Sequence, residues 1–158
     1  MVMNTSMIQR ISSLLHKDFT SIKGEPHNPT VILNHFNFTV ETINRTNMMA
    51  HYCPNKYKIY LNQEKTPQTQ RMILAHCLGH YILGHKYPDN FPEENAKTLL
   101  LGDYREIEAN IFAHNFVMPE KEVRQYVREL KDVEEQARIF GVSQKIMIKR
   151  FKDLGFLS

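Results

Sequence analysis

The chain begins with apolar residues at helical spacing. Short runs rich in β-branched and aromatic side chains follow. Apolar residues at positions 8, 11 and 15 predict a short amphipathic helix at the N-terminus. Three β-rich pieces, at residues 31–33, 36–40 and 57–61, predict a small sheet.

The rest of the chain has the pattern of successive helices. Thr66 can cap a long helix whose first position suits Pro67, and Gly84 and Pro88 supply its end. A loop is predicted at residues 86–92, and further helices over residues 104–116, 120–130, 132–140 and 143–154. The order of one helix, a small sheet and then helices predicts an α+β fold, with the sheet packed against a mainly helical part.

Length and composition are those of an ordinary globular protein. The chain has 158 residues, with 42% hydrophobic and 23% charged residues, which predicts a single domain over 1–158 with a helical C-terminal part at about 120–158. The net charge of +3 permits an acidic partner but does not demand nucleic acid. Two cysteines are too few for a disulfide framework, and no signal peptide or membrane-length apolar run is present, so we expect a cytoplasmic protein.

The chain carries eight histidines, and two of them lie four residues apart within the predicted long helix. His76 and His80 should sit about 40° apart around its axis and one turn apart along it. Two imidazoles so placed can bind one zinc ion. His85 would lie about 140° from His80 on the same axis and should not join that metal. A bare pair of this kind also occurs without any metal.

Such a site needs a third protein ligand from another element, and Glu108 is the best candidate. It shares one predicted helical face with Ile111, Phe112 and Asn115. A carboxylate on an apolar stripe is costly unless it is paired, and a metal dication would be such a partner. Glu106 lies on the other side of that helix and should face solvent. Glu108 could equally be a plain carboxylate of an amphipathic helix.

Two motifs together carry a family resemblance. Residues 76–85 read HCLGHYILGH, close to a family pattern H-E-L-G-H-Y-x-L-G-H, and residues 106–113 read EIEANIFA, close to E-x-E-A-N-x-F-A. Met118–Pro119 follows, as in the family. On these residues the chain resembles the ImmA/IrrE family of metallo-endopeptidases over roughly residues 45–158.

The resemblance implies a zincin-like fold and a zinc endopeptidase activity. His76, His80 and Glu108 would take over the family's ligand roles toward Zn²⁺. Known members cut or inactivate helix-turn-helix repressors, so the resemblance implies a transcriptional repressor as partner and a bacterial or phage origin.

Cys77 stands where the family pattern has its catalytic glutamate. Thiols are mostly protonated at neutral pH and cysteine is shorter than glutamate, so we expect impaired peptidase activity. The chain could be a naturally impaired relative or an active enzyme altered at one position. Cys77 could also take part in the metal site or act as a redox-sensitive gate, or be a small buried hydrophobe. A regulator that binds a transcription factor without cutting it is the main alternative function.

Two further features have both a functional and a structural interpretation. Tyr104, one turn before Glu108, could donate to a developing oxyanion, whereas His114 is less well placed and is not assigned. Residues 137–150 have helix-turn-helix character, with Lys145, Lys149 and Arg150 on the second helix. We favour two packed helices with a solvated basic face over DNA contact, because the charge is modest.

Overall fold

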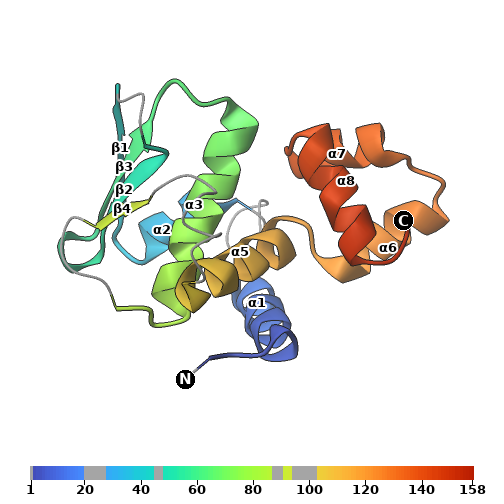
Figure 1. The fold of residues 1–158 in the computed structure, drawn as a ribbon, viewed down its shortest axis with the longest axis horizontal. Helices are drawn as coiled ribbons and strands as arrows, with labels where there is room; N and C mark the ends of the chain where they lie inside the picture. Colours follow the sequence, from blue (N-terminus) through green and yellow to red (C-terminus); the bar gives the residue numbers. More distant parts are fainter. Residues whose placement is uncertain (1, 20–27, 45–47, 87–90, 94–102) are drawn as a thin grey trace.

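The computed structural model describes residues 2–19, 28–44, 48–86, 91–93 and 103–158. It has the α+β architecture that the sequence predicts, with a small sheet, helices packed against it and a helical C-terminal part (Figure 1). None of the helices within these ranges is long and apolar enough to cross a membrane.

The N-terminal half contains two helices and most of the sheet. Its elements are α1 (Thr5–Phe19), α2 (Pro29–His35), β1 (Thr39–Ile43), β2 (Ala50–Cys53), a 3₁₀ turn at Pro54–Lys56 and β3 (Lys58–Asn62). The short strand β4 (Phe91–Glu93) joins the sheet from farther along the chain.

The sheet has the order β1-β3-β2-β4. Strands β1 and β3 are parallel, with Val40 opposite Ile59, whereas β2 runs antiparallel to both β3 and β4. The predicted loop at 86–92 therefore ends in an edge strand, and residues 87–90 lie outside the described part of the chain.

The prediction of a strand at residues 31–33 is wrong, because these residues lie in α2. The Asn28 side chain accepts a hydrogen bond from the Thr30 amide, and Pro29 occupies the first helical position. These start signals set the conformation, and Ile32 and Leu33 then face the core. The predicted strand at 36–40 is confirmed only at its end, since β1 begins at Thr39.

The second half is helical, as predicted. It contains α3 (Pro67–Ile82), α5 (Tyr104–Val117), α6 (Glu120–Arg128), α7 (Val133–Phe140) and α8 (Gln144–Asp153). Each of four helices begins at a side chain that caps its backbone, namely Thr66, Asp103, Asp132 and Ser143. Capping residues of this kind fix a helix start through local hydrogen bonds, which explains why these boundaries were predictable.

The main core lies between the sheet, α1, α2, α3 and α5. Its fully buried side chains include Ile8, Leu33, Phe38, Tyr52, Ile59, Leu78, Phe112 and Phe116. Helices α6–α8 pack on one another around Val123, Phe140 and Met147 and lie to one side of α5 (Figure 1).

Buried Arg150 connects α8 to the end of α5. Its Nε donates to the Met118 carbonyl at 3.0 Å and its Nη2 donates to Asn115 Oδ1 at 2.9 Å. Only 3% of Arg150 is exposed, so this guanidinium holds helices together and is not available to a phosphate.

Helices α3 and α5 pack tightly against each other at Gly79. A Cβ atom at this position would lie 3.0 Å from the Phe112 ring, 3.1 Å from the Ala109 carbonyl oxygen and 3.2 Å from the Ala109 Cα. Two of these neighbours are backbone atoms, which cannot turn aside as a flexible side chain can. The glycine therefore sets the distance between the two helices.

We expect Gly79→Ala to destabilise the protein although alanine favours helices. The methyl group forces α3 and α5 apart, at a cost of roughly 1–3 kcal/mol for an overpacked site, against about 1 kcal/mol gained in helix propensity. The free energy of unfolding, from urea denaturation, measures the balance. A variant as stable as wild type, or more so, would show that the helices separate without cost.

Candidate metal centre

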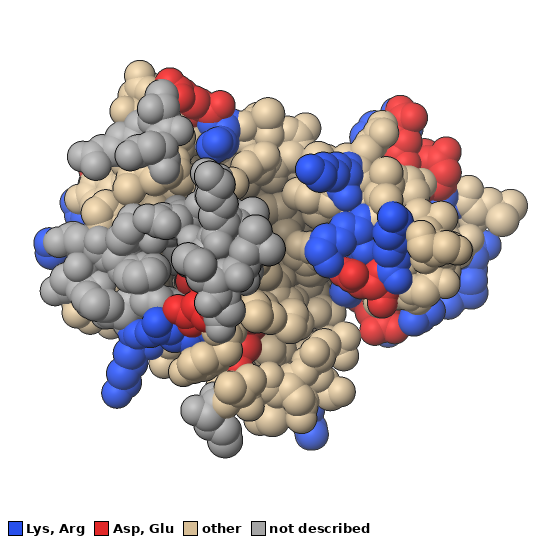
Figure 2. Space-filling view, viewed as in Figure 1, with Lys and Arg blue, Asp and Glu red and all other residues tan. Residues whose placement is uncertain are grey.

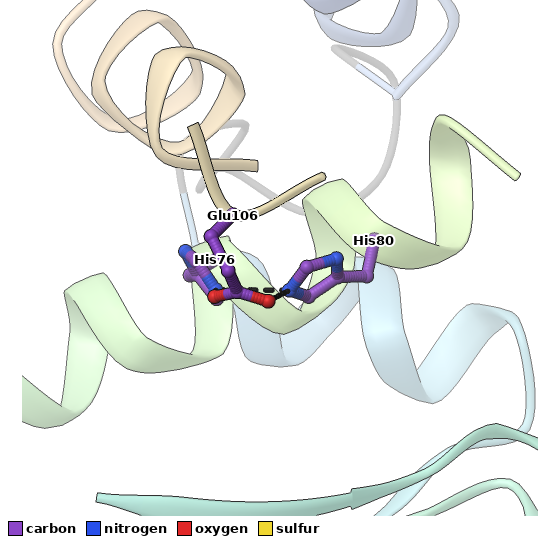
Figure 3. Close-up of side chains that lie close together, drawn as sticks. All are labelled: His76, His80 and Glu106. Carbon is purple, nitrogen blue, oxygen red and sulfur yellow. Dashed lines mark hydrogen bonds and ion pairs between the residues drawn. The ribbon is translucent and has the colours of Figure 1, made fainter. Parts of the chain in front are cut away.

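The imidazoles of His76 and His80 meet on one side of α3. The two residues lie one turn apart, and their Nε2 atoms are 2.9 Å from each other (Figure 3). His80 is completely buried and the side chain of His76 is 13% exposed. The helix thus brings the predicted pair together, with both nitrogens aimed at one point.

The carboxylate that faces this pair belongs to Glu106. Its Oε2 lies 2.9 Å from His76 Nε2 and its Oε1 lies 3.2 Å from His80 Nε2 (Figure 3). Glu106 is only 3% exposed, so the expectation that it faces solvent is wrong. Among the described residues, His76, His80 and Glu106 form the group of side chains that could hold a metal ion.

Glu108 lies beside this cluster and not within it. Its Oε2 accepts a hydrogen bond from His85 Nε2 at 2.8 Å, and its Oε1 accepts one from the Met3 amide. It is 2% exposed. Glu108 as the third ligand stays a prediction, and the geometry favours Glu106 for that role.

The face of α5 explains why the two glutamates are easily confused. The buried residues of this helix, which include Glu106, Glu108, Ala109, Phe112 and Asn115, cover an arc of about 200° around its axis. The apolar stripe that singled out Glu108 is therefore only part of a wide buried face. The missed signal is Asn110, which lies four residues after Glu106 and shares its side of the helix.

Hydrogen bonds to the outer ring nitrogens fix how the two imidazoles are protonated. Asn110 Oδ1 can only accept, so His76 Nδ1 at 2.8 Å carries the proton and donates it. His85 donates through Nε2 to Glu108, so its Nδ1 accepts from His80 Nδ1 at 2.9 Å. In the neutral imidazoles that metal binding requires, both Nε2 atoms would therefore carry lone pairs.

This arrangement fits a borderline metal ion such as zinc. Two lone pairs and a carboxylate that point at one another repel, and a shared cation removes that repulsion. Two nitrogens bound to tetrahedral zinc at about 2.0–2.1 Å lie roughly 3.3 Å apart, close to the 2.9 Å between the two Nε2 atoms. Three protein ligands leave a fourth position open, as in catalytic zinc sites.

The electrostatics keep the carboxylate ionised. Burial alone would raise the pKa of Glu106, but hydrogen bonds and charge from His76 and His80 outweigh burial and lower it well below its usual range. Burial also lowers the pKa of His85, against the opposing effect of Glu108. At neutral pH the site therefore holds a carboxylate and a neutral His85, which suits cation binding.

Cys77 and Tyr104 occupy different environments. Cys77 is fully buried in the main core. Tyr104 is 41% exposed at the start of α5, and its ring centroid lies 6.4 Å from that of His85. Its role as an oxyanion donor stays a prediction.

A cleft of about 610 Å³ lies between α1, α5 and α8, on the side of α5 that carries Asn110. It is lined by Thr5, Gln9, Ile107, Asn110, Ile111, His114, Asn115, Lys149, Arg150, Asp153 and Leu154. Because Asn110 also holds His76, the cleft reaches the residues around the candidate metal centre.

Comparisons with known proteins agree with this geometry. The sequence profile of the peptidase family described as the IrrE N-terminal-like domain matches residues 30–152. The chain belongs to this family.

A solved structure of similar fold is that of a Mycobacterium tuberculosis transcriptional regulator, with a TM-score of 0.63 and 15% sequence identity. The match covers 95% of this chain and 52% of the regulator, so the chain spans about half the length of that protein. No curated protein matches the sequence. Members of the IrrE-like family share a fold related to metallopeptidases and regulators, and this chain keeps side chains that could bind a metal.

The two glutamates can be separated by their effect on zinc binding. We expect Glu106→Gln to weaken zinc binding more than Glu108→Gln does, because Glu106 faces both Nε2 atoms. Zinc affinity, measured by competition with a chromophoric chelator, checks this order. Glu134→Gln on α7, whose side chain is 61% exposed, is the matched control and should bind zinc as wild type does. The reverse order of the two site variants would establish Glu108 as the ligand.

The lowered pKa of His114 predicts how the free energy of unfolding changes with pH. Burial, together with the positive charges of Lys149 and Arg150, lowers its pKa from an ordinary 6.5 to about 4. The unfolded chain then binds this proton between pH 6.5 and 4 while the folded chain does not, so stability falls as pH falls through that window. Between pH 7 and 5 the contribution is at most about 2 kcal/mol.

Urea denaturation of the metal-free protein at pH 7 and pH 5 measures this effect. His114→Gln should lose less stability than wild type over that interval, because glutamine does not titrate. Equal losses in the two proteins would mean that His114 is protonated as easily when folded as when unfolded.

Proposed function

We propose that this chain is a zinc metallo-endopeptidase-type protein that acts on a helix-turn-helix repressor, with catalysis impaired at Cys77. The observation that carries the proposal is the convergence of His76, His80 and Glu106 on one point, within a member of a peptidase family. The ion would be Zn²⁺, which suits two imidazoles and one carboxylate with an open position.

The residues around the ion have separate tasks. Zinc held by His76, His80 and Glu106 would supply a Lewis acid and would lower the pKa of a bound water molecule. The Glu106 carboxylate offsets part of the charge on the ion. Asn110 holds the ring of His76 through Nδ1, so that Nε2 faces the ion.

The missing part is a general base. Family members use the glutamate after the first histidine to take a proton from water and pass it to the leaving amine. Cys77 is a thiol buried in an apolar core, where burial disfavours the thiolate. General acid–base catalysis contributes about 10²–10⁴-fold, and the rate should be lower by a factor in that range.

The cleft between α1, α5 and α8 and the edge of the sheet are the surfaces where a polypeptide could bind. An extended segment can add to a sheet edge through main-chain hydrogen bonds, and β4 is an edge strand of the described sheet. The similarity in fold to a transcriptional regulator supports a role in transcriptional control. A repressor in the cytoplasm is the partner that the family resemblance implies.

A second candidate is a regulator that binds the transcription factor without cutting it. The observation that favours it is the burial of Cys77 in the main core, at the position where family members have their catalytic glutamate. In this case the ion stabilises the fold and the partner dissociates intact.

DNA binding through α7 and α8 has less support. Arg150 is buried against α5, and Lys149 is paired with Asp153 at 2.9 Å. On the face shown in Figure 2, the basic side chains over the C-terminal helices have acidic side chains among and beside them. Phosphate binding depends on clustered positive charge.

Cys77→Glu tests the account of the missing base. We expect this change to create or restore zinc-dependent cleavage of a helix-turn-helix repressor from the same genome, by about 10²–10⁴-fold over wild type. Cleavage is followed by gel electrophoresis with zinc and with a chelator. Wild-type protein that cleaves as fast as Cys77→Glu would show that no glutamate is needed.

Cys77→Ala is the matched control and should not gain activity. Zinc content and circular dichroism of each variant show whether the buried glutamate has unfolded the protein. A repressor that binds wild type and Cys77→Glu equally and is cut by neither supports the non-catalytic regulator.

A further inference from the structure

A hydrogen-bonded chain leads away from the candidate metal centre through His80. His80 Nδ1 lies 2.9 Å from His85 Nδ1, and His85 Nε2 lies 2.8 Å from Glu108 Oε2. The three side chains are at most 5% exposed. The three side chains therefore form a buried series of polar contacts.

The backbone places His85 here by ending α3 in a tight reversal. Gly84 has φ = +70°, a left-handed conformation that favours glycine, and the His85 amide donates to the His80 carbonyl at 3.0 Å. The chain therefore turns back over the last helical turn, and the His85 ring lies against the ring of His80, with centroids 5.1 Å apart. The helical angle that excluded His85 from the metal assumed that α3 continues, and α3 ends before it.

We propose that His85 and Glu108 are positioning residues that orient His80 for the metal. Glu108 accepts the Nε2 proton of His85, which leaves His85 Nδ1 as an acceptor. His85 then accepts the Nδ1 proton of His80, which leaves the His80 Nε2 lone pair directed at Glu106 and His76. The inference rests on the metal site of the proposed function.

The two metal imidazoles are supported differently. His76 donates to a neutral amide, that of Asn110. His80 donates through a second imidazole to a buried carboxylate, which makes the ligand nitrogen more basic as well as fixing its ring. A carboxylate buried to this degree needs such partners, and Glu108 has two of them, His85 and the Met3 amide.

Two substitutions at His85 separate orientation from simple packing. Glutamine has a carbonyl oxygen that can accept from His80 Nδ1 and an amide group that can donate to Glu108, so His85→Gln can keep the chain of hydrogen bonds. Leucine fills similar space but can do neither. His35→Leu, at an exposed position at the end of α2, is the matched control.

Zinc affinity of each full-length variant is measured by competition with a chromophoric chelator. We expect His85→Leu to bind zinc about 10–100-fold more weakly than wild type, which is the usual loss when a partner of a metal-binding histidine is removed. His85→Gln should recover most of the affinity, and His35→Leu should match wild type. The visible spectrum of the Co²⁺ form should change in His85→Leu and stay near that of wild type in His85→Gln.

Glu108→Gln is the second variant, for use if His85→Leu does not fold. It keeps an oxygen that can accept from His85 but removes the charge, and should weaken zinc binding by about tenfold, at the lower end of that range. Thermal denaturation of the metal-free proteins shows whether folding itself has changed. A purely structural role would lower the metal-free midpoint and leave the affinity of the folded protein unchanged.

The outcomes distinguish this inference from the proposed function. Wild-type protein that binds no zinc would overturn both. Wild-type protein that binds zinc, with His85→Leu and Glu108→Gln binding equally well, would overturn the positioning role alone. Equal weakening in His85→Leu and His85→Gln would also overturn it, because hydrogen bonding would not then be the cause.

Discussion

The close contact between α3 and α5 is the constraint on which the site depends. Because Gly79 has no side chain, the backbone of α5 packs directly against α3, with Ala109 and Phe112 opposite the glycine. Gly79 lies between His76 and His80 in the sequence. Glu106 lies one helical turn before Ala109, the residue that faces Gly79. A wider spacing would draw the carboxylate away from both imidazoles, so packing and chemistry are set by the same residue.

Around that contact the structure places polar groups in pairs. Each imidazole that could bind the ion is held by one partner at its outer nitrogen, Asn110 for His76 and His85 for His80. Asn110 lies four residues after Glu106, so both project from the same side of α5. His85 is placed by the left-handed Gly84, which turns the chain back after α3. Under the proposed function, both candidate imidazole ligands would therefore keep their partners even though Cys77 would not serve as a base.

The sequence predicted the helices of the second half to within a few residues because capping residues and glycines mark their ends. It failed at residues 31–33, where three aliphatic residues in a row look alike in a strand and in a buried helix, and only Asn28–Pro29 decides between them. It paired the two histidines correctly in space. It did not place Glu106, because assigning faces by an apolar stripe works for a helix with a narrow buried side, and the buried face of α5 is wide enough to include both Glu106 and Glu108.

The hydrogen bond between the Met3 amide and Glu108 joins the first residues of the chain to the surroundings of the metal. The residues before α1 thus contact a side chain more than a hundred positions later in the sequence. The backbone around Met3 therefore belongs to the surroundings of the candidate metal centre, whereas Phe156, after α8, contacts Phe151 and Arg124 in the C-terminal helices. A change in the path of the chain before α1 would reach Glu108 without altering any residue of α3 or α5.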